Sequence, residues 1–219
     1  MKLRNLIRLN WWATMRLNYC AGGLSTLFRM PVKVYGKLRL DIKGKLILPE
    51  NAQRNTLIIG SEHEDYTATA RRAQLSLFGT WKIGGCVRIG IDSYVGIAKG
   101  ALLEMQGNCF IGRDTQIHCF NHISFGEDVF AGELYATDSD AHSIIKEGKR
   151  HEMYGEVTIG EGTYLGFRTI LLKGTDIPPF SVVASGAVCC KNYRAHGHEK
   201  LLLAGVPACI KHTDTTALF

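Results

Sequence analysis

The chain has 219 residues, 46% of them hydrophobic, and a formal net charge of +6. This length supports one sizeable domain with its own core and does not require two. No uncharged apolar run reaches the roughly 18 residues of a membrane-spanning helix, so we expect none. The basic residues are spread along the chain, which argues against a nucleic-acid-binding arm. A modest positive charge suits a phosphorylated ligand or an anionic membrane surface.

Residues 1–30 differ from the rest of the chain and predict an amphipathic basic helix. Apolar and basic residues alternate there at helical spacing: Leu3, Leu6, Ile7, Trp11 and Trp12, with Lys2, Arg4, Arg8 and Arg16 between them. Such a helix either packs on the end of the domain or on a subunit partner, or lies in a membrane interface, where tryptophan beside arginine is typical.

Residues 31–76 are expected to hold the first strands and an irregular entry segment. Apolar residues alternate over 32–60 around Gly36, Gly44 and Pro49, as in short strands joined by turns. Residues 61–76 are polar, with Glu62-His63-Glu64-Asp65 and Arg71-Arg72, and predict a loop or short helix.

From residue 77 to 200 a six-residue repeat dominates. A six-residue period matches neither the 3.6-residue period of an α-helix nor the two-residue alternation of a single strand. It fits a coil of short strands separated by corners. The aliphatic residue then points inward, and the small residue beside it lets neighbouring backbones approach. Two-residue slips near 101–111 and 117–125 predict wider corners. The apolar positions expected to point inward are Ile83, Ile89, Val95, Ile111, Ile117, Phe125, Ala131, Ile159, Leu165, Leu171, Ile177 and Val183.

The repeat is interrupted once, by an excursion over residues 137–158. This segment carries Asp138-Ser139-Asp140-Ala141-His142 and then Glu152-Met153-Tyr154. A regular scaffold that stops for a segment rich in Asp, His and Glu indicates that the segment is reserved for chemistry. Residues 201–219 are expected to form a C-terminal cap and tail.

Seven cysteines, an odd number, are scattered without a pair of CxxC motifs. No secretory signal pattern is visible, so we expect free thiols and a cytoplasmic location. Most of the cysteines fall within hexads, where they are expected to serve as small apolar packing groups.

These features resemble the hexapeptide-repeat acyltransferases, especially sugar O-acetyltransferases of the galactoside, maltose and capsule or O-antigen type. The hexads, the Asp-x-Asp-x-His excursion and the closing Ala204-Gly205-Val206-Pro207-Ala208 stretch carry the resemblance. It implies an all-β solenoid, a left-handed parallel β-helix with an N-terminal helix and a protruding loop. It also implies a homotrimer with acetyl-CoA lying between neighbouring subunits, and a role in surface polysaccharide biosynthesis. The basic, tryptophan-bearing N-terminus favours work at the inner face of the membrane.

An acetyl transfer to a sugar hydroxyl needs a base within hydrogen-bond reach of that hydroxyl. Imidazole is suited to this near neutral pH, and His142 matches the family's base by position. Glu152 is expected to fix the tautomer of the ring. Asp138, Asp140 and His118 are expected to contact the acceptor. Backbone amides at a corner of the coil would stabilise the oxyanion.

The resemblance also implies a cofactor path past Phe167, Ser185, Cys190, Lys191 and Lys211, with the lysines as phosphate partners. The sequence departs from the family here. Phe167 replaces a small residue, Ser185-Gly186-Ala187 replaces Ala-Gly-Ser, and Cys190 stands where threonine is common. These departures leave the pantetheine contacts and the acyl length open. No metal is expected.

Three alternatives stay open at this point. One is N-acetylation of an amino-sugar nucleotide by similar parts. Another is a metal-dependent lyase of the γ-carbonic anhydrase type, in which His118, His122 and His142 would converge on zinc between subunits. The last is a non-catalytic scaffold that binds a partner or a nucleotide sugar.

Overall fold

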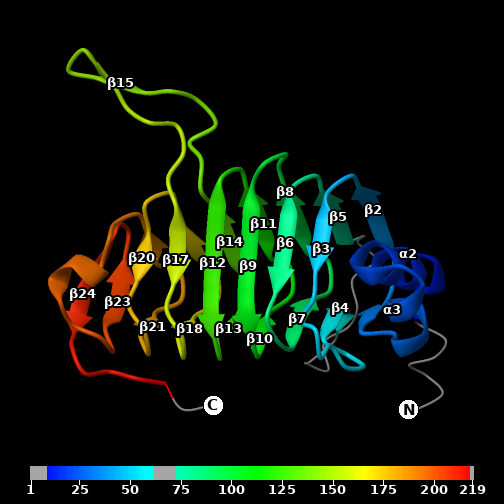
Figure 1. Ribbon diagram of the computed structural model, residues 1–219. Helices are drawn as coiled ribbons and strands as arrows, with labels where there is room; N and C mark the ends of the chain where they lie inside the picture. Colours follow the sequence, from blue (N-terminus) through cyan, green and yellow to red (C-terminus); the bar gives the residue numbers. More distant parts are fainter. Residues whose placement is uncertain (1–8, 62–72, 218–219) are drawn as a thin grey trace.

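The protein is a left-handed parallel β-helix, seen here in a computed structural model that describes residues 9–61 and 73–217. Three sheets form the sides of an elongated prism, with two short helices at its N-terminal end and one long loop projecting from an edge (Figure 1). The predicted fold class is therefore confirmed.

The described strands of the prism fall into three sheets, which we number in the order in which the chain visits them. Sheet 1 contains, within the described residues, β1 (Val32–Val34), β4 (Leu57–Ser61), β7 (Val87–Gly90), β10 (Cys109–Ile111), β13 (Phe130–Ala131), β18 (Tyr164–Leu165), β21 (Val182–Val183), β23 (Leu202–Gly205) and β24 (Ala208–His212). Sheet 2 contains β2 (Leu38–Ile42), β5 (Ala73–Leu77), β8 (Tyr94–Ile97), β11 (Gln116–Cys119), β14 (Leu134–Thr137), β19 (Thr169–Leu171) and β22 (Val188–Cys189). Sheet 3 contains β3 (Lys45–Ile47), β6 (Thr80–Ile83), β9 (Leu102–Gly107), β12 (His122–Glu127), β17 (Val157–Ile159) and β20 (Asp176–Ile177).

Each coil crosses sheets 1, 2 and 3 in turn, and parallel pairing stacks equivalent positions of successive coils. Leu165 of β18 pairs with Val183 of β21, and both side chains are fully buried. Small residues follow these inward positions because the coils lie close together: a Cβ atom on Gly84 would come within 2.2 Å of the Gln106 carbonyl oxygen. The aliphatic stack down the prism is the hydrophobic core.

The two predicted slips are absorbed by longer strands and not by wider corners. Strands β9 and β12 have six residues, whereas β18, β20, β21 and β22 have two. Side chains alternate between the two faces of a strand with a period of two residues. Two extra residues therefore leave the same side chains pointing inward. The large side chains of Trp81 and Phe125 are fully buried in this longer-stranded part of the prism.

The coil begins earlier than the boundary predicted at residue 77. Val32 of β1 already pairs in parallel with Leu57 of β4, so the segment expected to hold only entry strands forms complete coils. The repeat was hidden there because successive turns are longer than 18 residues. The polar segment 62–72 lies outside the described residues.

Helices α2 (Trp11–Gly22) and α3 (Leu24–Arg29) pack at the N-terminal end of the prism. These two helices fall within residues 1–30, where an amphipathic helix was predicted. The apolar and basic residues at positions 2–8, which belong to that prediction, lie outside the described residues. No helix among the described residues is both long and apolar enough to span a bilayer.

The C-terminal end is closed by β23 and β24, which form an antiparallel hairpin on sheet 1. The buried Tyr193, which precedes the short 3₁₀ helix Arg194–His196, donates a hydrogen bond of 3.1 Å to the Ala208 carbonyl and ties this hairpin to the coil. We call Cys109, Cys119 and Cys189 the buried thiols, and Cys86, Cys190 and Cys209 the exposed thiols. All of them are free, and burial raises the pKa of the buried thiols, to about 11 for Cys109 and about 12 for the other two.

Candidate active site

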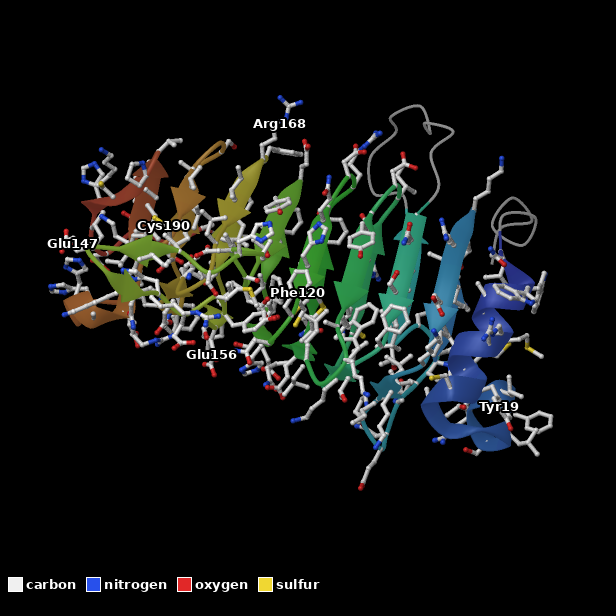
Figure 2. The ribbon with its side chains drawn as sticks, turned by 90° about the horizontal axis from the view of Figure 1, so that it is seen from above. Tyr19, Phe120, Glu147, Glu156, Arg168 and Cys190 are labelled. Atoms are coloured by element: carbon white, nitrogen blue, oxygen red, sulfur yellow. The ribbon has the colours of Figure 1, made fainter. Side chains whose placement is uncertain are left out.

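The excursion leaves the prism between β14 and β17, at the edge shared by sheets 2 and 3. Its outer part is a small antiparallel hairpin of β15 (Ile145–Lys146) and β16 (Lys149–Arg150). The loop projects far from the edge and leans toward the C-terminal coils, with Glu147 at its tip (Figures 1 and 2). It therefore reaches out over coils that follow it in the sequence.

The two legs of the excursion form a ribbon with one bulge, and the predicted catalytic pair lies at that bulge. On the prism side, the Asp140 amide donates to the Met153 carbonyl at 3.0 Å. On the outer side, the His151 amide donates to the Ile144 carbonyl at 2.8 Å. These two pairs leave residues 141–143 opposite the single residue Glu152. His142 and Glu152 therefore sit at the same level of the ribbon, on opposing legs.

Both side chains at this bulge are exposed, and His142 follows a residue with left-handed backbone, Ala141, whose φ is +62°. No hydrogen bond joins the His142 ring to Glu152 within the described part of the chain. The arrangement brings the predicted base and its partner to one place without locking the ring.

Asp138 does not occupy the position expected of an acceptor ligand. It is completely buried, and its carboxylate accepts hydrogen bonds from the Phe120 amide at 2.7 Å and the Asn121 amide at 2.8 Å. The Cys119 thiol lies 3.7 Å away and also donates to it. The carboxylate therefore caps the corner of the preceding coil, where exposed amides would otherwise be unpaired. It anchors the first residue of the excursion to that coil.

Asp140 is held by a lysine that sequence reasoning missed. Lys173 lies at the same edge one coil later, and its ammonium is 2.5 Å from the Asp140 carboxylate. The same ammonium donates to the Glu152 carbonyl. Since Asp140 and Glu152 belong to opposite legs, Lys173 clamps the ribbon closed just below His142. The only signal in the sequence was the position of Lys173, one turn of the repeat beyond the excursion.

His118 lies on the outer face of sheet 2, in what we call the aromatic row. Its ring centroid is 4.7 Å from that of Tyr94 and 5.4 Å from that of Tyr135. Burial between these rings lowers the pKa of His118 below its ordinary value of 6.5. The row ends beside a groove of about 220 Å³ lined in part by Gln116, Tyr135 and Arg168. The outer face of sheet 2 thus offers flat rings and hydrogen-bonding groups next to the strand that leads into the excursion.

The five residues expected along the cofactor path lie on different edges of a single chain. Phe167 and Ser185 share the edge between sheets 1 and 2, where the Phe167 amide donates to Ser185 Oγ at 3.1 Å. Cys190 and Lys191 directly follow β22, at the edge that also bears the excursion. Lys211 is exposed on β24 of sheet 1. One chain alone therefore does not gather them.

His122 and His118, two histidines considered for a zinc site, are on different faces. His118 belongs to the outer face of sheet 2, whereas His122 on sheet 3 lies between carboxylates, 3.1 Å from Glu104 and 3.7 Å from Glu156. Lys82 also pairs with Glu104 at 2.9 Å, and its hydrogen bond is the main reason that the pKa of Glu104 is lowered. Within residues 9–61 and 73–217, no three His, Cys, Asp or Glu side chains are grouped to hold a metal ion.

Comparison with known proteins finds similar solved structures but no matching sequence. No family model and no curated protein sequence matches the chain. The solved structure of the polySia-specific acetyltransferase NeuO superimposes with a TM-score of 0.53 at 19% identity, over 86% of this chain and 88% of that one. The polysialic acid O-acetyltransferase OatWY gives a TM-score of 0.47 at 20% identity, over 86% of this chain and 77% of that one. The likeness to NeuO shows that the two chains share a fold.

Proposed function

We propose that this protein is an acetyl-CoA-dependent O-acetyltransferase that acts on a sugar hydroxyl, in a reaction of surface polysaccharide synthesis. The observation that carries the proposal is the excursion, in which His142 and Glu152 lie at the same level on opposing legs of a ribbon anchored to the prism by Asp138 and Lys173. The shared fold with an acetyltransferase supports it.

In the proposed reaction, the acceptor hydroxyl attacks the thioester carbonyl of acetyl-CoA while His142 removes the hydroxyl proton. Glu152 accepts a hydrogen bond from the other ring nitrogen and stabilises the imidazolium that forms. When the tetrahedral intermediate collapses, the C–S bond breaks, and His142 returns the proton to the departing thiolate. General-base assistance of this kind contributes on the order of 10²–10⁴ in rate.

The acceptor and donor surfaces follow from the same geometry. The aromatic row and the neighbouring groove suit the flat faces and hydroxyls of a saccharide, so we assign the acceptor to the outer face of sheet 2. Cys190 and Lys191 share the edge that bears the excursion and are the better-placed of the predicted cofactor residues. Because Phe167, Ser185 and Lys211 lie elsewhere on the chain, their predicted role requires a neighbouring subunit, as in the trimer implied by the family resemblance.

The test is a screen of saccharide acceptors with acetyl-CoA, followed by release of free CoA thiol. Polysialic acid, the substrate named for the structural neighbours, belongs among the acceptors. His142→Ala should lower turnover by roughly 10²–10⁴ while CoA binding is retained. Full activity in this variant would refute the assignment. Transfer to an amino group, with no transfer to hydroxyls, would favour the amino-sugar alternative.

A further inference from the structure

The N-terminal helices carry exposed apolar side chains that take no part in the proposed acetyl transfer. The inner face of α2 is occupied by structural contacts. The Val32 amide donates to Asn18 Oδ1 at 3.1 Å, Asn18 Nδ2 donates to the Val32 carbonyl at 2.9 Å, and the Val34 amide donates to Thr14 Oγ1 at 3.1 Å. The buried polar side chains of α2 thus cover the open edge of β1, which fixes the orientation of the helix.

The opposite face of the helix pair is apolar and exposed. We call it the aromatic patch and define it by Trp11, Trp12, Met15, Tyr19, Leu24 and Phe28, whose exposed fractions are 51%, 57%, 46%, 62%, 69% and 87%. Tyr19 points away from the prism (Figure 2). Beside Met15 and Tyr19 of this patch opens a groove of about 350 Å³, whose lining is completed by Arg16, Cys20, Leu27 and Ile42. Several large exposed apolar side chains on one pair of helices indicate an interaction site.

The charge of the chain is concentrated in the same segment. Residues 1–40 contain eight Lys or Arg and no Asp or Glu, whereas the remaining residues contain 18 basic and 20 acidic ones. This corrects the even distribution expected from the whole-chain count. Among the described cations, Arg16 and Arg29 are exposed on the two helices, and the Arg16 guanidinium lies 5.0 Å from the centre of the Trp12 ring.

An anionic bilayer surface fits this combination, whereas a second copy does not. A symmetric contact between two copies of the patch would bring two basic segments together with no carboxylate to offset them. At an anionic membrane, the tryptophan and tyrosine rings suit the headgroup layer, the larger apolar side chains the acyl boundary, and the arginines the lipid phosphates. We infer that the aromatic patch binds the surface of an anionic lipid bilayer, with α2 and α3 lying in the interface plane.

Flotation of the full-length protein with lipid vesicles tests this inference. Vesicles of phosphatidylcholine with phosphatidylglycerol should carry the protein upward, and vesicles of phosphatidylcholine alone should carry much less. Raising the salt from about 0.15 M to about 1 M should weaken the binding, because the arginine contribution is screened. Trp12→Ser with Phe28→Ser, and Arg16→Glu with Arg29→Glu, should each lower the vesicle partition coefficient by at least about 10-fold.

Ile145→Ser is the matched control, because Ile145 is also an exposed apolar side chain, at 73%, but lies on the excursion. It should float like the unmodified protein. All variants should keep their circular dichroism and melting temperature, since the changed side chains face solvent. Equal flotation of the patch variants and the control would overturn the inference. Loss of oligomer in the patch variants with vesicle binding unchanged would overturn it in favour of a subunit contact. Failure to acetylate any acceptor would bear on the proposed function alone.

Discussion

Replacing Lys173 by methionine removes the ammonium that joins the two legs of the excursion but keeps most of the apolar stem. The ammonium serves Asp140 and the Glu152 carbonyl, and the Lys173 and Asp140 side chains are 24% and 27% exposed. A hydrogen bond to a charged group contributes about 1.5–3 kcal/mol. With partial exposure, we take about 2 kcal/mol for the clamp, which corresponds to about a 30-fold change in the ratio of closed to open ribbon.

Two measurements should respond to this change. Hydrogen exchange at the Asp140 and Gly155 amides, which bond across the ribbon to Met153 and Asp138, should accelerate by up to about 30-fold. Acetyl transfer should fall through kcat in proportion to the closed fraction that is lost. This loss is small while the ribbon stays mostly closed and approaches about 30-fold only when the open form already predominates. The melting temperature should change little, since the excursion adds no side chain to the core of the prism.

The matched control is Lys82→Met, which removes another lysine–carboxylate pair, with Glu104 on sheet 3. It should leave both exchange and turnover unchanged. If Lys173→Met exchanges at the same rate as the unmodified protein, the clamp does not hold the ribbon. If the exchange rates show that the variant ribbon is mostly open and turnover is still unaffected, closure of the ribbon is irrelevant to the reaction.

Three further outcomes follow from buried groups. Asp138→Ala leaves two corner amides without an acceptor and should lower the free energy of unfolding by about 2–4 kcal/mol in urea titration; a fully stable variant would contradict the capping role. Because burial depresses the pKa of His118, the folded state resists its protonation, so stability should fall as the pH drops below about 6.5. His118→Gln should flatten this part of the stability curve, and an unchanged slope would refute the argument. In the native protein, alkylation at about pH 8 should label the exposed thiols within minutes and spare the buried thiols, with peptide mass spectrometry as the readout.

The regular part of the fold was predictable because each six-residue repeat shows by itself which of its residues points inward. Leu165 occupies the inward position of its hexad, and its strand partner Val183 occupies the same position one coil later. The first coils could not be read this way. Val32 and Leu57 are paired just as closely, but 25 residues separate them, so no constant period links them.

The site was predictable only where the sequence itself brings residues together. His142 and Glu152 lie in one excursion, so their proximity needed no knowledge of the coil. Asp138 is buried because its carboxylate binds the Phe120 amide at a corner one coil earlier. Lys173, which clamps the ribbon, comes from the corner one coil later. Contacts between coils are set by stacking, which a motif within one segment does not reveal.

The position of the excursion explains how a long insertion is compatible with a tightly stacked prism. The core resumes without a gap, because Ala136 before the loop and Val157 after it are both fully buried. The insertion therefore costs mainly loop-closure entropy, which grows only slowly with length. Asp138 and Lys173 reduce that cost by fixing both ends of the ribbon to the adjoining coils. The residues of the loop can thus change while the stacked core remains intact. This explains how an Asp-x-Asp-x-His motif is carried by an otherwise regular repeat.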